Sequence, residues 1–177
     1  MKLVSIKDFA KFMGLSMLQR NISVSPLKLQ KLLYYQQAWH MVFFGRGNTL
    51  FADVPEAWVN GPVYTSIYPV YKDKVDGMCD HMKPEHFLQE GEDMNSAIES
   101  LAKEMGLEDE EMNLANEIIM LYGTKSQNYL IFLTHSEDPW AEKRIGLQPY
   151  EASSTPISLD TMYRYYKERH DKYGNKQ

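Results

Sequence analysis

The sequence predicts a mainly α protein, folded as a compact helical domain with at most a small β element near residues 54–63. Apolar residues recur at helical spacing through most of the chain, and residues that favour helix ends flank these segments. The chain has 177 residues, 44% of them hydrophobic, which suits one hydrophobic core rather than two. We therefore expect residues 1–177 to form a single domain.

Two helices are predicted near the N-terminus. Ser5 is a suitable N-cap for a short amphipathic helix that we expect Gly14 to close. In the next helix Ser25 is the expected N-cap, Pro26 takes the first helical position, and Gly45 is the stop. Because the last turns of this second helix are apolar on every face, we expect it to lie at the centre of the fold.

The stretch from 54 to 63 breaks the helical pattern. Pro55, Gly61 and Pro62 interrupt it, and the Asn-Gly pair that ends at Gly61 favours a turn between two short extended segments. A short helix over 64–71 and a polar linker over 73–92 are predicted to follow.

The remaining helices are expected over 93–105, 109–122, 126–133, 140–144 and 158–173. Gly106 and Gly123 follow the first two, and Ser126 caps the third. We expect Asp138 to be the N-cap of the fourth, with Pro139 in its first turn.

Charge is distributed unevenly along the chain. Residues 84–123 contain eleven acidic residues and one basic residue, a net charge of −10. The remaining 13 acidic and 18 basic residues give +5. Neither part has the clustered basic stripe of a nucleic-acid-binding protein, so nucleic acid is not an expected partner.

The expected location is the cytoplasm. The lone cysteine, Cys79, can pair with nothing in its own chain, and a free thiol suits a reducing compartment. The first residues lack a signal-peptide core, and no apolar run approaches the roughly 18 residues needed to span a bilayer.

Few residues have the spacing of a reactive site. His135, Asp138 and His40 could bind a metal if they met, but structural hydrogen bonds and a helix cap explain them as well, so we predict no metal and no cofactor. Thr134 beside His135 leaves a cryptic hydrolase, with Asp138, as the enzymatic alternative. No catalytic residue is predicted, and a binding protein is the favoured class.

The lysines of the second helix and the aromatic residues around it each allow two interpretations. Lys28 and Lys31 could contact phosphate, but we expect them on the solvated face of a helix whose other side is core. The aromatic residues could form a recognition surface, but most are expected in the core: Tyr34, Tyr35, Trp39, Trp58, Tyr64, Tyr68 and Tyr71.

Three motifs occur in series. The first, L-K-L-Q-K-L-L-Y-Y, consists of Leu27, Lys28, Leu29, Gln30, Lys31, Leu32, Leu33, Tyr34 and Tyr35. The second, W-x-x-G-P-V, consists of Trp58, Gly61, Pro62 and Val63. The third, L-T-H-x-x-x-P-W, consists of Leu133, Thr134, His135, Pro139 and Trp140. In order and spacing the chain resembles the Panacea domain, the SocA-like antitoxin or GepA phage-associated family.

The resemblance implies a cytoplasmic antitoxin of a bacterial or phage toxin–antitoxin pair, which neutralises a protein toxin by direct binding. Toxins of this family are of several types, including some that act on nucleotides or tRNA. One branch instead delivers its toxin to a cytoplasmic protease as an adaptor, and that alternative stays open. The family has no established enzymatic function.

The sequence also indicates which residues could bind the partner and which have a structural role. We expect the toxin to contact some of Lys28, Lys31, Trp58, Tyr64, Glu108, Asp109, Glu110 and Glu111. The acidic ones allow two interpretations: they could cover a basic toxin surface, or they could form an outer face that contacts only solvent. We expect "LTHSEDPW" to be a structural corner in which Trp140 is the anchor and His135 makes a hydrogen bond.

Overall fold

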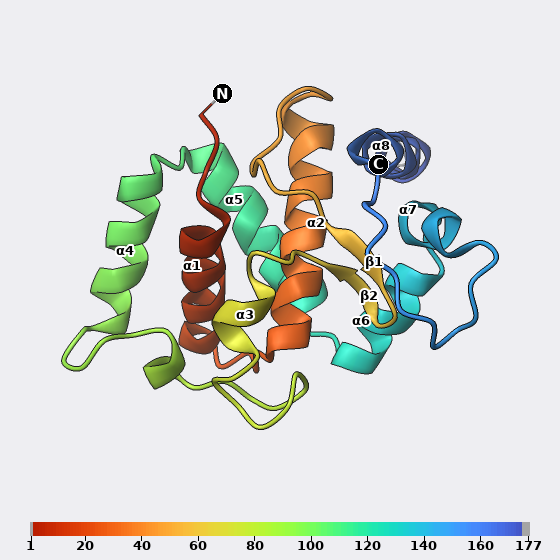
Figure 1. Cartoon of the computed structure of the whole chain (residues 1–177). Coiled ribbons are helices and arrows are strands. Elements are labelled where there is room, and N and C mark those ends of the chain that lie inside the picture. Colours follow the sequence, from red (N-terminus) through yellow and green to blue (C-terminus); the bar gives the residue numbers. More distant parts are fainter. Residues whose placement is uncertain (1, 175–177) are drawn as a thin grey trace.

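The computed structural model describes residues 2–174 and is mainly α-helical with one small sheet, as the sequence predicts (Figure 1). Its α-helices are α1 (Ile6–Gln19), α2 (Pro26–Phe44), α3 (Tyr68–Tyr71), α4 (Met94–Met105), α5 (Asp109–Ile118), α6 (Gln127–His135), α7 (Asp138–Ala141) and α8 (Leu159–Gly174). The 3₁₀ segments are η1 (Pro84–His86) and η3 (Glu142–Arg144), and η2 (Ile119–Gly123) is a π-helix. Within residues 2–174, no helix has both the length and the apolar content needed to cross a membrane.

Helix α2 lies at the centre of the fold, as predicted. It packs against α1, α5, α6, α8 and β2, and Figure 1 shows it between α1 and α8. Its ends follow the local signals: the Ser25 hydroxyl accepts a hydrogen bond from Lys28 N at 3.1 Å, and Gly45 has a φ of 109°. Most of its residues are buried on every side because other elements surround it.

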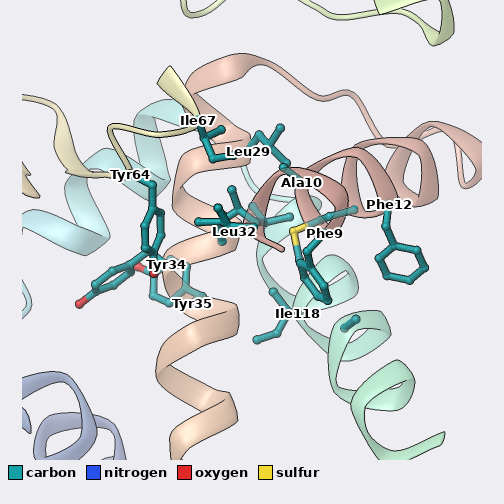
Figure 2. Packing of buried hydrophobic residues seen from close by; sticks show 14 of the residues in the cluster. Phe9, Ala10, Phe12, Leu29, Leu32, Tyr34, Tyr35, Tyr64, Ile67 and Ile118 are labelled. Carbon is teal, nitrogen blue, oxygen red and sulfur yellow. The ribbon is translucent and has the colours of Figure 1, made fainter. Parts of the chain in front are cut away.

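The buried apolar side chains form one core around α2. In Figure 2, Leu32 of α2 lies between the side chains of Phe9 from α1 and Tyr64 from the loop after β2. All three are 0% exposed. The core therefore joins the N-terminal helix to the segment that follows the sheet.

The sheet is the small element predicted near residues 54–63. Strands β1 (Glu56–Trp58) and β2 (Gly61–Val63) pair antiparallel, with Trp58 opposite Gly61. Gln30 of α2 holds the end of this hairpin: its Oε1 accepts from Tyr64 N at 2.8 Å, and its Nε2 donates to Tyr64 O at 3.2 Å. A buried side-chain amide thus replaces the next strand partner.

Some predicted helix boundaries are wrong. Helix α1 continues through Gly14 to Gln19, because Gly14 serves packing: a Cβ there would lie 2.4 Å from the Phe87 ring. The helix predicted over 109–122 changes to a π-helix at Ile119. Asp138 is the first residue of α7, and the N-cap position belongs to Glu137, whose side chain makes no capping hydrogen bond.

Candidate functional site

The three motifs meet at one buried junction. It brings together Lys31 of α2, Gly61 of β2 and Thr134 of α6. Lys31 Nζ donates to Pro62 O at 3.0 Å. Gly61 has a φ of 98°, and a Cβ there would lie 2.7 Å from both Lys31 Nζ and Thr134 Oγ1. Glycine is therefore required by both the backbone conformation and the space.

The lysines of α2 are not on a solvated face, and that prediction is wrong. Lys31 is 0% exposed and Lys28 is buried. Lys28 Nζ donates to Ser23 O at 3.0 Å and to Gly123 O at 2.8 Å, so each lysine stabilises backbone carbonyls of a neighbouring segment. Burial lowers the pKa of both, that of Lys31 to about 7.

The other motif residues are mostly buried as well. This holds for Leu27, Leu29, Gln30, Leu32, Leu33, Tyr34, Tyr35, Gly61, Pro62, Val63, Thr134, Pro139 and Trp140, whereas Trp39 is half-buried. Tyr64, nominated for partner binding, is 0% exposed, so its side chain is not available to a partner in this conformation. The motifs thus form the scaffold of the fold.

The corner at "LTHSEDPW" is held by aromatic stacking. The His135 ring lies face to face with the Trp140 ring, and Trp140 Nε1 donates to Trp58 O at 2.9 Å. Burial, with the positive charge of Lys31, lowers the pKa of His135, and a backbone hydrogen bond with Val59 opposes this shift. The lowered pKa favours the neutral form of the imidazole, which suits a ring packed against an indole.

Thr134, His135 and Asp138 are not arranged for hydrolysis. Thr134 is 0% exposed, and its hydroxyl donates to Leu130 O and Ile131 O, each at 3.0 Å. Among the hydrogen bonds of residues 2–174, none joins any two of the three. Asp138 is exposed, so its carboxylate is not buried against the imidazole as an orienting group would be.

The hydrogen-bond partners of His40 lie outside the corner. Its Nδ1 lies 3.0 Å from Asn48 O and its Nε2 lies 3.3 Å from Glu111 Oε1. In the described part of the chain, no three His, Cys, Asp or Glu side chains come close enough to hold a metal ion.

Glu137 is a buried acid that the sequence reasoning missed. Its side chain accepts hydrogen bonds from Tyr166 at 2.6 Å and from Tyr35 at 3.3 Å. Burial raises the pKa of Glu137 to about 7. In the sequence, Glu137 lies between His135 and Asp138, a pattern typical of a polar turn. The tyrosines that surround its carboxylate, Tyr35 and Tyr166, belong to α2 and α8.

A hollow of about 510 Å³ lies beside the β hairpin. Its lining includes Trp58, Val59, Asn60, Tyr68 and residues 152–154. Trp58 is half-buried, so of the residues nominated around this hairpin it is the one that a partner could touch.

The acidic residues at the start of α5 separate into two groups. Glu108, Asp109 and Glu110 are exposed, as a partner-binding role requires. Glu111 is buried: one carboxylate oxygen accepts from Glu108 N at 3.0 Å and the other faces His40. Glu111 therefore belongs to the helix start and the core rather than to the acidic surface.

The fold and this junction define a mainly α protein built around one buried central helix. Residues 29–141 match the family described as "Antitoxin SocA-like, Panacea domain". This match spans all three motifs from Leu29 onward, and the chain belongs to that family. Neither a curated protein nor a solved structure matches the chain.

Proposed function

We propose that this protein is the antitoxin of a toxin–antitoxin pair and neutralises a cognate protein toxin by direct binding. This proposal is supported by the match of residues 29–141 to an antitoxin family. The protein would act in the cytoplasm as one unit, with the toxin encoded by the adjacent gene.

Binding rather than catalysis is supported by how the motif residues are used. Thr134 and Lys31, which could be chemically reactive, are 0% exposed and donate hydrogen bonds to backbone carbonyls. A toxin would reach the outer surface of the helices instead.

Exposed acidic residues at the start of α5 could contribute to recognition of the toxin. Glu108, Asp109 and Glu110 are exposed in a row at the start of α5. Toxins that act on nucleotides or tRNA need basic surfaces for their substrates, and an acidic helix would be complementary to such a surface. We propose that this complementarity speeds association.

A growth assay tests the proposal. The adjacent open reading frame is expressed alone and together with this chain, and we expect growth arrest that co-expression relieves. Immunoblotting of the toxin separates the two mechanisms: sequestration leaves its level unchanged, whereas delivery to a protease shortens its half-life. Persistent arrest with both proteins folded and present would refute the antitoxin role.

A further inference from the structure

An apolar groove lies where the C-terminal end of α2 meets α5, η2 and α8. We call it the α2–α5–α8 groove; its apolar lining is Trp39, Phe43, Leu114, Ile118, Leu121, Tyr122 and Tyr173. It has a volume of about 360 Å³. A second hollow of about 330 Å³ shares Phe43, Leu114 and Glu117 with it, so the two hollows lie next to each other.

Large apolar side chains on this groove are open to solvent. Phe43 is 53% exposed, Leu121 is 56% exposed and Tyr173 is 57% exposed, and they come from three different elements. Single exposed apolar residues are ordinary, but several around one hollow mark an interaction surface.

Leu121 lies in the π-helix η2 and faces outward. Tyr122, its neighbour, turns inward and stacks on Tyr35 with ring centroids 3.9 Å apart, and its hydroxyl accepts from Trp39 Nε1 at 2.9 Å. Because Tyr122 is held in the core by these contacts, the side chain of Leu121 points toward solvent at the edge of the groove. π-Helical turns occur frequently at functional sites.

The α5 side of the groove is acidic. Glu117 lines the groove and Glu110 lines the second hollow, and both are exposed, whereas the α8 side of the groove carries Arg169 and His170. The two glutamates are two turns apart on one side of the helix, a spacing of about 10 Å. Within residues 2–174 neither carboxylate forms an ion pair with a lysine, arginine or histidine. A ligand that fills the groove would therefore be favoured if it carried basic groups along this side.

We propose that the α2–α5–α8 groove binds one amphipathic helix of the toxin. This inference rests on the proposed function and adds the docking surface and the chemistry of the partner. The helix lays its apolar side on Phe43, Leu121 and Tyr173, with lysine or arginine facing Glu110 and Glu117. A helix is the expected ligand because an apolar helix face in a hydrophobic groove is a recurrent recognition mode.

Variants of exposed residues test the apolar contact without disturbing the core. Leu121→Glu and Phe43→Glu should each weaken binding of the purified adjacent-gene protein about tenfold or more, measured by calorimetry. The matched control is Phe132→Glu on α6, which adds the same charge at a residue that is 70% exposed and lies outside the groove. Circular dichroism and thermal melts confirm that each variant folds.

Charge variants test the acidic α5 side of the groove. Glu110→Lys with Glu117→Lys should weaken binding and reduce its salt dependence, whereas Glu99→Lys with Glu104→Lys, the same change of charge on exposed residues of α4, should leave both unchanged. Overlapping peptides of the toxin then locate the helix. The binding peptide should have apolar residues at i, i+3/i+4 and i+7 and basic residues on one side of them.

The outcomes distinguish this inference from the proposed function. If the wild-type protein neither binds the adjacent-gene protein nor relieves its toxicity, the antitoxin role itself fails. If wild type binds while the groove variants bind equally well, or if only Phe132→Glu weakens binding, the groove is not the docking site. If Phe43→Glu converts a dimer to a monomer and leaves toxin binding intact, a second copy occupies the groove, and the proposal is overturned.

Discussion

The His135 and Trp140 rings stack in parallel, with their centroids 3.9 Å apart and their planes inclined by 9°. The contact crosses the junction between α6 and α7, and the Trp140 indole in turn donates to Trp58 O. The third motif is thereby fastened to the second, so the histidine has a packing role in the corner.

Replacement of His135 by alanine should destabilise the protein by about 1 kcal/mol, the contribution expected of one aromatic pair. Thermal unfolding with circular dichroism measures this change. Relief of toxicity should persist, because the imidazole contacts no partner in this account. Loss of relief in a variant that still folds and still binds toxin would return catalysis to consideration.

Gly61→Ala should destabilise the protein by about 2 kcal/mol or more, because it combines a positive φ with a clash against Lys31 and Thr134. Gly91→Ala is the matched control: Gly91 has a φ of 79° with open space around it, so alanine there is strained without a clash. Chemical denaturation compares the two variants. Equal losses would show that the junction tolerates a Cβ.

Glu137 should make stability fall as pH rises. Its pKa is raised from 4.5 to about 7 in the folded state, so between these values the folded protein binds more protons than the unfolded chain. The stabilisation is complete below pH 4.5 and is lost as pH rises through 7, by at most about 3 kcal/mol.

Glu137→Gln keeps a neutral side chain that can still hydrogen-bond Tyr35 and Tyr166. Denaturation midpoints from pH 5 to pH 8 should therefore decline for wild type and stay flatter for this variant. The same slope in both proteins would assign the pH dependence to other groups.

Charge reversal of Glu108, Asp109 and Glu110 to lysine should slow toxin association and flatten its salt dependence. Steering by these charges weakens as salt shortens the Debye length to about 10 Å at 0.1 M. Stopped-flow mixing at low and high salt measures the rate. Glu111 is left unchanged because it is buried at the start of α5, and an unaltered rate at low salt would contradict the role of this surface.

Local signals allowed much of the fold to be predicted. Ser25 and Gly45 influence the backbone only within a few residues of their own position. They mark the beginning and the end of α2, as expected. Gly14 has the same local appearance as a helix stop, yet its neighbour Phe87 comes from a segment far along the chain. Tertiary packing overrode the local signal there.

The candidate site depends more on such distant partners. Lys31 has the spacing of an exposed lysine, but the hairpin carbonyl that it binds and the segments that bury it cannot be seen in a helical pattern. Glu137 is recognised as a core residue only when Tyr35 and Tyr166 surround it. The motifs were enough to identify the family. Which of their residues are buried and which are exposed could be seen only in the structure.

Calorimetry with the two purified proteins tests whether this chain binds the toxin directly. Titration of this chain into the adjacent-gene protein should give a saturable, stoichiometric complex that coelutes in gel filtration. The same complex should block the toxin's activity in a purified system without protease. Absence of heat and of coelution with an active, folded toxin would rule out neutralisation by direct binding.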